Sequence, residues 1–376
     1  MAKLINCDME YFLDYIRNKR IIAFGAGSKF RMFLERFELV DRVDFVVDND
    51  EGKQGIRVEA GGKSFAVRSA QALVDPCKAG AAILITNLAG FLSIMEQINA
   101  MPELDGTEVF YTYLMQDNCR NERIEYPQGA QRIPRIIHYC WFGGNPIPEK
   151  LQRYMDTWHR YLPDYEIRRW DESNYDVRKN SYMREAYERE YWGFVPDYAR
   201  LDIVYEHGGI YLDTDVEVVK SFDDMLACKA FFGFAYYGDI ATGLGFGAEP
   251  GDRLVKELRD YYDGIHFVLP NGEPDLSTCI AHQSSIFQRN GFSFNNRWQY
   301  IDSRAIYPME VLNPRGALHI NDLTSRHTHA IHHNENSWFK EHDRQNILNI
   351  RSGGWKRYLD TAAQRHCDGI SCGALL

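Results

Sequence analysis

Asp213 and Asp215 are the residues of this chain whose type and spacing most suggest chemistry. They are separated by one residue in the stretch HGGIYLDTDVEVV, residues 207–219. Residues i and i+2 of an extended segment point to the same face, so we expect the two carboxylates to converge while Thr214 faces away. Two such carboxylates cannot both ionise cheaply without a nearby cation. Mg²⁺ or Mn²⁺, which prefer oxygen ligands, would supply it, although a solvated strand end without a metal has the same spacing.

A charged pair and two glycines precede the aspartates. Asp197 and Arg200 are three residues apart on a predicted helix and therefore share one face. An arginine beside a metal suits a diphosphate, because a guanidinium binds phosphate oxygens in a bidentate manner. Gly208 and Gly209 allow a close turn of the backbone between helix and strand. This pattern favours a site for a metal and a diphosphate.

Trp141 follows the apolar strand IIHYC, residues 136–140. Parallel strands end at a common edge of a sheet, which is where α/β proteins bind ligands. The indole could stack on a nucleobase there, and a core aromatic residue is the alternative interpretation.

Alternating strands and helices must position these residues, and they predict an α/β fold with parallel strands. We expect four domain segments: a Rossmann-like domain over 1–120, a polar linker over 121–133, a second α/β domain over 134–340 and a C-terminal helical extension over 341–376. The first domain is predicted to begin with a helix over 1–20, followed by strands within 21–30, 42–50, 81–86 and 107–114 and a helix over 90–101. In the second, the stretch IYLDTDVEVV, residues 210–219, is predicted to be one strand.

The stretch GAGSKF, residues 25–30, invites a dinucleotide-binding interpretation. The fingerprint G-x-G-x-x-G needs a third small residue for close packing of helix and strand, and Phe30 stands there instead. Asp48 lies at a suitable distance along the chain for a ribose hydroxyl. The structural alternative, a glycine turn without a ligand, is favoured because the fingerprint is incomplete.

Composition narrows the function classes. The 376 residues carry a net charge of −10, which disfavours a general nucleic-acid binder. The eight cysteines show no C-x-x-C spacing and are typical of reduced thiols. We see no signal peptide, and no run of about 18 apolar residues that would span a membrane. We therefore expect a soluble cytoplasmic protein, with peripheral membrane contact left open.

Three segments in the same order resemble glycosyltransferase family 32, whose members contain a D-x-D motif. They are IPRIIHYCWFGGNPIPE, FVPDYARLDIVYEHGGIYLDTDVEV and AIHHNENSW. The resemblance covers about residues 132–340 and extends more distantly to the glucosylating domains of large clostridial toxins. It implies a GT-A fold, a nucleotide-sugar donor, Mn²⁺ or Mg²⁺ and retention of anomeric configuration. It does not include the N-terminal domain.

The resemblance assigns roles to residues of the motif region. Asp197 and Arg200 would hold donor-sugar hydroxyls and phosphate, and Tyr211 would be the aromatic residue of the donor site. Asp213 would contact ribose or sugar hydroxyls, and Asp215 would ligate the metal.

Further donor-binding roles fall on Trp141, beside the base, and on Ser337 and Trp338 in the C-terminal loop. The same loop contains His332 and His333. Successive strand residues face opposite ways, so only one histidine should reach the metal or diphosphate, and His332 is preferred.

The implied activity is a metal-dependent retaining hexosyltransferase. It would move a sugar from a nucleotide sugar, with UDP as the default nucleotide, to a glycan or lipid-linked oligosaccharide. Capsular polysaccharide, O-antigen or lipopolysaccharide synthesis would use such an enzyme. The sequence shows no convincing nucleophile, so attack on the leaving-group face is favoured.

Three alternatives compete with this function. A haloacid-dehalogenase-type phosphohydrolase also carries D-x-D, but its signature has Thr or Val where Glu217 stands. An NAD-dependent sugar-nucleotide oxidoreductase would use the N-terminal domain. A catalytically inactive carbohydrate-binding relative would keep the fold without transfer.

Overall fold

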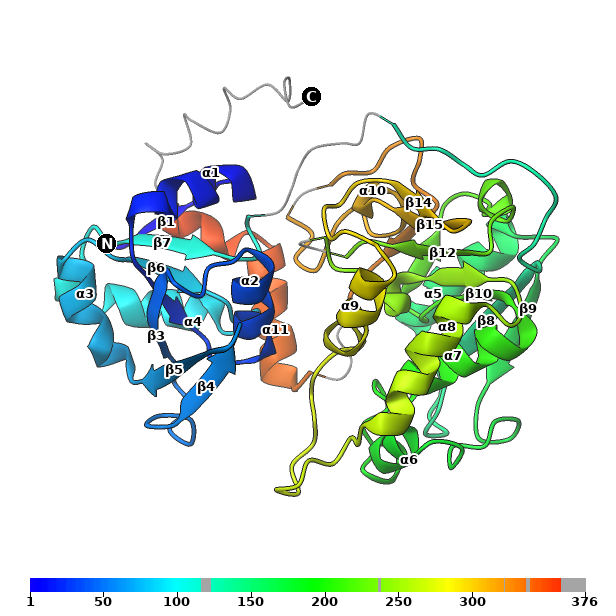
Figure 1. Cartoon of the computed structure of the whole chain (residues 1–376), viewed down its shortest axis with the longest axis horizontal. Helices are drawn as coiled ribbons and strands as arrows, with labels where there is room; N and C mark the ends of the chain where they lie inside the picture. The colour runs from blue at the N-terminus through cyan, green and yellow to red at the C-terminus, as the bar shows by residue number, and fades with distance from the viewer. Residues whose placement is uncertain (116–122, 236–237, 321, 336–338, 360–376) are drawn as a thin grey trace. The chain divides into compact units, whose positions relative to one another are not determined.

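The chain forms two compact units, one from Met1–Cys119 with Phe339–Leu376 and one from Arg120–Trp338. The computed structural model describes residues 1–115, 123–235, 238–320, 322–335 and 339–359. The first unit is therefore built from both ends of the chain, and the sequence of the second lies between them (Figure 1).

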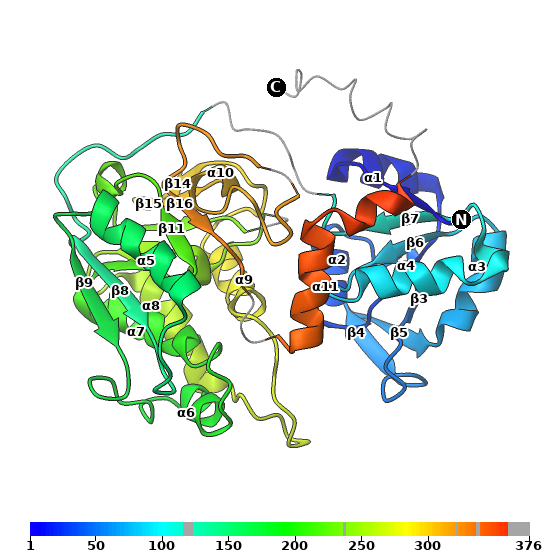
Figure 2. The ribbon, with the colours of Figure 1, turned by 180° about the vertical axis from the view of Figure 1, so that it is seen from behind.

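The first unit contains a seven-stranded sheet whose strands are parallel except for β4 at one edge. Helix α2 covers one face, and α4 and α11 cover the other (Figures 1 and 2). Strands covered on both faces are apolar throughout, as in the fully buried run Ile21–Phe24. The strands, in spatial order, are β1 (Lys3–Ile5), β7 (Glu108–Tyr111), β6 (Ala82–Ile85), β2 (Ile21–Phe24), β3 (Val43–Val47), β5 (Lys63–Arg68) and β4 (Arg57–Ala60).

The two terminal segments of the chain were expected to be helical, and the structure shows a strand in the first of them and helical turns in the second. Residues expected in a helix over 1–20 begin with strand β1, which pairs with β7, before helix α1 (Met9–Tyr15). The described part of the expected C-terminal extension forms α11 (Glu341–Arg351) and a 3₁₀ turn. Leu359 there makes a β-bridge to Leu4, so this segment belongs to the first unit. The other helices are α2 (Ser28–Arg36), α3 (Val74–Lys78) and α4 (Phe91–Asn99).

The glycine turn after β2 is held by side chains of neighbouring strands. Asp48 accepts a hydrogen bond from the backbone N–H of Ala26 at 2.8 Å. Gly25 has φ +114°, and a Cβ there would lie 2.8 Å from Thr86 Oγ1. The glycine is thus needed for the turn itself, and the carboxylate considered for a ribose hydroxyl binds the turn. These contacts support the structural interpretation of GAGSKF.

The second unit contains a mixed seven-stranded sheet with helices α7 and α8 on one face and α5 on the other (Figures 1 and 2). Strands β8, β9 and β10 are parallel to one another, and β13 runs antiparallel beside β10. The α/β class predicted from the sequence is confirmed. The strands, in spatial order, are β14 (Gln299–Ile301), β15 (Arg304–Tyr307), β12 (Ala230–Gly233), β13 (Phe246–Ala248), β10 (Gly209–Tyr211), β8 (Ile136–Cys140) and β9 (Glu166–Trp170).

A separate two-stranded sheet pairs β11 (Val216–Val218) with β16 (Ala330–His332). The α-helices of the second unit are α5 (Glu149–Tyr161), α6 (Ser181–Glu188), α7 (Pro196–His207), α8 (Arg253–Asp260), α9 (Cys279–Arg289) and α10 (Met309–Leu312).

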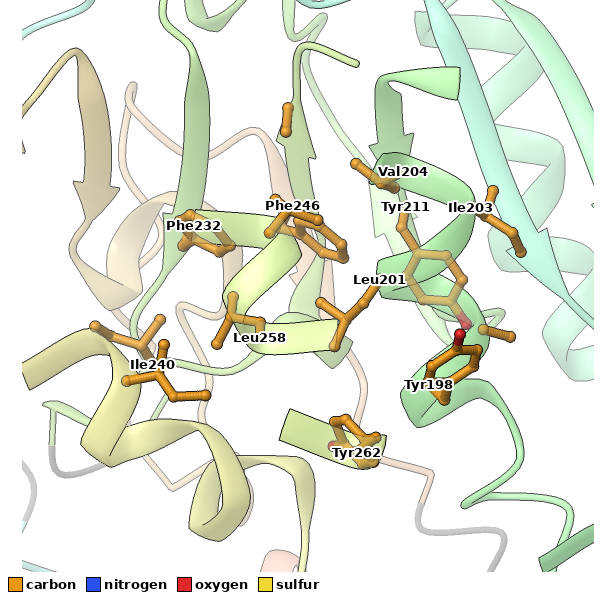
Figure 3. Packing of buried hydrophobic residues seen from close by; sticks show 14 of the residues in the cluster. Tyr198, Leu201, Ile203, Val204, Tyr211, Phe232, Ile240, Phe246, Leu258 and Tyr262 are labelled. Carbon is orange, nitrogen blue, oxygen red and sulfur yellow. The ribbon is translucent and has the colours of Figure 1, made fainter. Parts of the chain in front are cut away.

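Helix α7 packs on the sheet through an apolar face (Figure 3). Leu201 and Val204 of the helix lie in one buried cluster with Tyr211 and with Phe246 and Phe232 of the strands. The rings of Phe232 and Phe246 stack with centroids 5.6 Å apart. This core fixes α7 against β10.

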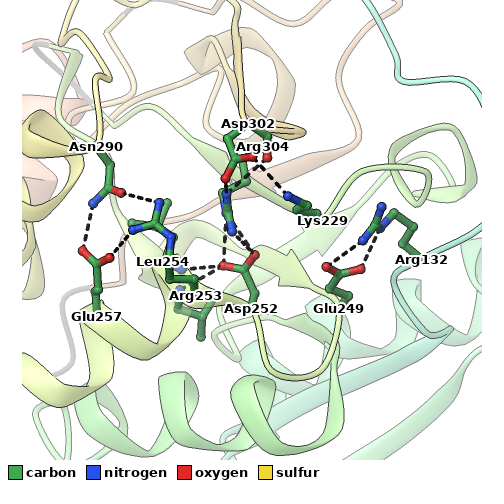
Figure 4. A network of polar contacts seen from close by, with 11 residues as sticks. Arg132, Lys229, Glu249, Asp252, Arg253, Leu254, Glu257, Asn290, Asp302 and Arg304 are labelled. Carbon is green, nitrogen blue, oxygen red and sulfur yellow. Dashed lines mark hydrogen bonds and ion pairs between the residues drawn. The ribbon is translucent and has the colours of Figure 1, made fainter.

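A buried ion pair ties helix α8 to strand β15 (Figure 4). Asp252 caps α8 by accepting hydrogen bonds from the N–H groups of Leu254 and Val255. Its carboxylate also lies 2.8 Å from the Arg304 guanidinium, and the two side chains are 0% and 5% exposed. Both charges are compensated, which is the condition for burying them.

The junction between α7 and β10 depends on two glycines and a histidine. Gly208 and Gly209 have φ +64° and +98°, and a Cβ on Gly209 would lie 2.7 Å from the Ile136 carbonyl oxygen. His138 Nε2 lies 2.8 Å from the Gly208 carbonyl oxygen, and Trp170 donates its indole N–H to His138 Nδ1 at 3.1 Å. These partners satisfy the neutral tautomer that carries its proton on Nε2.

His138 should make the stability of the second unit pH-dependent. Burial lowers its pKa from 6.5 to about 4. The unfolded chain therefore takes up the proton first, and stability present above pH 6.5 is lost as the pH falls towards 4. The shift corresponds to about 3 kcal/mol of unfolding free energy. Urea unfolding, followed by tryptophan fluorescence between pH 7.5 and 4, measures it.

His138→Gln should flatten this pH profile, whereas replacement of the exposed His159 by Gln should leave it as in the wild type. A His138→Gln profile as steep as that of the wild type would contradict the assignment.

Candidate active site

The two aspartates lie in a turn that connects the large sheet to the small one. Strand β10 ends at Tyr211, and the turn is closed by a hydrogen bond from Val216 N to the Asp213 carbonyl oxygen at 3.1 Å. The prediction of one continuous strand over 210–219 is therefore wrong, because the chain leaves one sheet here and enters another. The turn nevertheless brings Asp213 and Asp215 together at the carboxyl end of β10.

Strand β16 adds a histidine to this acidic turn. His332 pairs with Val216 in the small sheet, and its Nε2 lies 3.2 Å from Asp215 Oδ1. Three ligand atoms, one each from Asp213, Asp215 and His332, lie within 4.8 Å of one another. The structure thus gathers the three residues that the sequence assigned to the metal.

The adjacent histidine faces away from the acids. His333 Nε2 lies 2.9 Å from Glu217 Oε2, and its ring stacks on Tyr154 with centroids 4.0 Å apart. The backbone N–H of His333 donates to the Asp215 carbonyl oxygen at 3.0 Å. Of the two histidines, the structure therefore places His332 at the site.

Helix α5 holds β11 from the other side. The buried Trp158 donates its indole N–H to the Val216 carbonyl oxygen at 2.8 Å. Val218 N–H donates to Thr157 Oγ1 at 2.9 Å. The backbone that follows Asp215 is thus fixed both by a helix and by β16.

Arg200 lies between two carboxylates. Its Nη2 is 3.1 Å from Asp197 Oδ1 and 3.5 Å from Asp213 Oδ1. Its Nε donates to the Pro196 carbonyl oxygen at 3.1 Å, one turn back along α7. Asp197 and Arg200 are only 4% and 3% exposed, so their side chains form the buried base of the site.

Tyr211 lies beneath the aspartates and is 1% exposed. Its hydroxyl donates to Asp213 Oδ1 at 2.9 Å, and the Arg200 guanidinium lies over its ring at 5.1 Å. The residue expected to contact the donor therefore orients Asp213 and supports Arg200 from below.

Burial and neighbouring charges shift the pKa values of the site in different directions. Burial raises the pKa of Asp213, Arg200 opposes this and Asp215 adds to it. Burial would also raise the pKa of Asp215, but the charge and hydrogen bond of His332 hold it well below its usual range. The pKa of His332 is raised by Asp215 against the effect of burial. Burial raises the pKa of Asp197 to about 7.

This donor set fits a divalent cation. Two carboxylates and one imidazole supply oxygen and nitrogen ligands of the kind that Mn²⁺ accepts, and Mg²⁺ would favour the oxygens. A cation at this point would replace the proton that His332 shares with Asp215, and would offset the repulsion between Asp213 and Asp215.

Glu335 is a residue of the site that the sequence motifs did not single out. Its backbone N–H donates to Asp215 Oδ2 at 2.9 Å. Its carboxylate is held by Lys150 Nζ at 2.7 Å and by the Tyr154 hydroxyl at 3.1 Å. Glu335 lies between His333 and Ser337 in the segment AIHHNENSW, and this position could have indicated that it belongs to the site.

Trp141, Ser337 and Trp338 are the other residues predicted to bind the donor, and the structure describes only the first of them. Trp141 follows β8 at the sheet edge where β10 also ends, and its indole N–H donates to the Asn145 carbonyl oxygen at 2.6 Å. The structure shows it at that edge and in contact with its own loop. Ser337 and Trp338 lie outside the described residues.

A pocket of about 620 Å³ lies at the end of β9, between the loop over 172–178 and α6. Tyr175 and Tyr187 line it together with acidic and basic side chains. Tyr175 donates to the buried Asp202 at 2.7 Å, and Lys179 lies 2.6 Å from the same carboxylate. Because β9, β8 and β10 are parallel, the loop that lines this pocket follows β9 at the sheet edge where the aspartate turn follows β10.

Residues 148–232 match the family model described as the glycosyltransferase sugar-binding region containing a DXD motif. This range includes the α7 pair and the aspartate turn, and it lies wholly in the second unit. This part of the second unit is therefore similar to the sugar-binding region of DXD-containing glycosyltransferases. The expected resemblance to DXD-containing glycosyltransferases is confirmed, and the matched range contains the second of the three sequence segments in full.

Known proteins similar to the chain include several glycosyltransferases. An uncharacterised glycosyltransferase, L373 of Acanthamoeba polyphaga mimivirus, is 25% identical over 219 residues, which are 55% of this chain and 84% of that protein. Inositol phosphoceramide mannosyltransferase 1 of Schizosaccharomyces pombe is 31% identical over 120 residues, 28% of this chain and 35% of its own length. Mannosyltransferase 3 of the same yeast is 32% identical over 127 residues, 31% of this chain and 33% of its own length.

The chain thus spans about a third of each yeast relative. A solved structure, the PaToxG glycosyltransferase, aligns with a TM-score of 0.31 and 21% identity over 42% of this chain and 70% of that chain. Within the described ranges, every helix is too short or too polar to cross a membrane.

The two adjacent histidines provide a test of the metal site. His332→Ala should weaken Mn²⁺ binding at least about tenfold, because it removes one of three ligands. His333→Ala is the matched control, since that side chain contacts Glu217 and Tyr154. Isothermal titration calorimetry with Mn²⁺ measures both variants, and thermal unfolding checks that each is folded. Equal losses for the two variants would contradict the assignment of His332.

Proposed function

We propose that this protein is a metal-dependent glycosyltransferase that moves a hexose from a nucleotide sugar to a glycan or lipid-linked acceptor. The observation that carries the proposal is the placement of Arg200 and Asp213 directly beside the Asp215–His332 pair. The Arg200 guanidinium, the Asp213 carboxylate that can bind sugar hydroxyls, and the set of possible metal ligands thus lie close together. They belong to the unit in which residues 148–232 match the DXD family model.

The residues of the site have separable tasks in this reaction. Asp215, His332 and Asp213 would hold a Mn²⁺ or Mg²⁺ ion. When bound, this ion would act as a Lewis acid on the diphosphate. Arg200 would offset the negative charge that develops on the leaving diphosphate. Its position is set in advance by Asp197 and the Pro196 carbonyl, so little reorganisation is needed.

Asp213 would accept hydrogen bonds from sugar or ribose hydroxyls through Oδ2. Its other oxygen, Oδ1, already receives the Tyr211 hydroxyl and faces Arg200. The tyrosine therefore fixes the orientation of the free oxygen towards the donor.

Retention of configuration is proposed to occur by attack on the leaving-group face. Asp197 and Asp213 are both bound to Arg200, and Asp215 is bound to His332. A carboxylate engaged in this way is a poor nucleophile, so we favour direct attack of the acceptor hydroxyl on the anomeric carbon. As the bond to the diphosphate breaks, the leaving diphosphate oxygen takes the proton of that hydroxyl. Proton NMR of the first product would show the anomeric configuration directly.

Two observations support a choice of donor sugar and acceptor to test first. The yeast relatives are named as mannosyltransferases that act on inositol phosphoceramide, which makes mannose and a lipid-linked acceptor reasonable choices here. The toxin-like resemblance of the sequence makes UDP-sugars the other choice. Polysaccharide or lipopolysaccharide synthesis would supply such acceptors.

Donor hydrolysis tests the activity without knowledge of the acceptor. We expect release of nucleoside diphosphate from GDP-mannose or a UDP-hexose with Mn²⁺, inhibition by EDTA and restoration by added Mn²⁺. Asp215→Asn and Asp213→Asn should lower the rate at least about a hundredfold, because each removes a charge at the leaving group.

Glu217→Gln is the matched control for these variants. Glu217 follows Asp215 by two residues but pairs with His333, so its replacement should leave the rate within about threefold of the wild type. Full activity of a folded Asp215→Asn protein would overturn the metal assignment. Turnover that is indifferent to EDTA would do the same.

A further inference from the structure

The 3₁₀ turn Thr242–Leu244 passes directly against the Arg200–Asp213 pair. A Cβ built on Gly243 would lie 2.8 Å from Asp213 Oδ2 and 2.9 Å from Arg200 Nη1. Gly243 does not have a left-handed φ, so its backbone conformation is open to other residues. The requirement for glycine is therefore one of space beside these two side chains.

A buried polar chain fixes this turn. Thr242 donates its hydroxyl to Gln283 Oε1 at 3.1 Å, and Gln283 Nε2 donates to the Tyr262 hydroxyl at 3.4 Å. All three residues are 0% exposed. Removal of one partner would leave a buried polar group unsatisfied. These hydrogen bonds therefore hold the turn Thr242–Leu244 against Gln283 of α9 and against Tyr262 of the 3₁₀ helix Tyr261–Gly264.

The oxygen of Asp213 that remains for a ligand is the one beside Gly243. Oδ1 is engaged by Tyr211 and faces Arg200, whereas Oδ2 faces the Gly243 position. Likewise, Nη2 of Arg200 is directed at the carboxylates and Nη1 lies beside Gly243. A hydroxyl that binds Oδ2 must therefore lie next to the main chain of this turn.

We propose that the turn Thr242–Leu244 forms one wall of the donor-sugar pocket and that Gly243 is a specificity-determining residue, because only glycine leaves sugar hydroxyls room to reach Asp213 and Arg200. This inference rests on the proposed function. It distinguishes the sugar end of the site from the metal end, where Asp215 and His332 would hold the cation that binds the diphosphate.

Gly243→Ala tests the wall. The added Cβ should lower kcat/KM for hydrolysis of GDP-mannose or UDP-glucose with Mn²⁺ by about tenfold to a hundredfold, since small displacements at a reacting centre have effects of this size. The Kd of GDP or UDP with Mn²⁺ should change by less than about threefold, because these molecules keep the ribose and lack only the hexose, whose hydroxyls we place beside Gly243. Gly264→Ala is the control, as a Cβ there meets open space and φ is not left-handed. It should match the wild type in both measurements.

The outcomes separate the two proposals. Equal losses in nucleotide-sugar turnover and nucleoside diphosphate binding would place Gly243 beside the nucleoside diphosphate and overturn the inference, as would an unchanged Gly243→Ala enzyme. Wild-type protein that neither hydrolyses nor binds any nucleotide sugar with Mn²⁺ would overturn the proposed function, and the inference with it.

If Gly243→Ala does not fold, Gln283→Met provides the second variant. It removes the acceptor of Thr242 without adding bulk beside Asp213. A rise in KM for the nucleotide sugar with an unchanged Kd for the nucleoside diphosphate would support the wall. Parallel changes in both would contradict it.

Discussion

The site depends on the compensation of one buried cation, Arg200. Its guanidinium is 3% exposed and serves two carboxylates, Asp197 and Asp213, at 3.1 and 3.5 Å. A buried charge is tolerated only with such partners, and loss of one leaves the others uncompensated. Asp215, on the far side of Asp213, is outside this arrangement and relies on His332. The site is thus divided into a fixed ion pair and a pair that a divalent cation can take over.

The division follows from the way in which the chain changes sheets. Arg200 belongs to α7, which is packed on the large sheet, whereas His332 arrives from β16 of the small sheet. The turn between β10 and β11 joins the two sheets, and Trp158 of α5 donates a hydrogen bond to Val216 where this turn ends. Each half of the site is therefore supported by a different part of the core, while the charge of Asp215, which raises the pKa of Asp213, still links the two halves.

Local periodicity predicted the contacts made within one element, and not those that require two distant segments to meet. The spacing of Asp197 and Arg200 placed both on one face of a helix, and the structure shows them there as an ion pair. Strand alternation correctly implied that His332 and His333 face opposite ways. The pairing of β16 with β11 joins residues more than 100 positions apart, so no local pattern reports that it splits the predicted strand. The same holds for β1, a three-residue strand that is stabilised by β7 and hidden in an apparently helical sequence.

The first unit shows how a sequence motif can be explained by structure alone. Its strands β5, β3, β2, β6 and β7 follow the order of doubly wound folds, with a change of direction between β2 and β6. Gly25 lies at that point, yet the space beside it is taken by Thr86, and Asp48 is bound to the backbone of Ala26. A ribose hydroxyl would have to compete with that hydrogen bond. In the second unit, by contrast, Asp213, Asp215 and His332 bring possible ligand atoms within 4.8 Å of one another, with Arg200 beside Asp213. These groups, and not the glycine turn of the first unit, form the candidate active site.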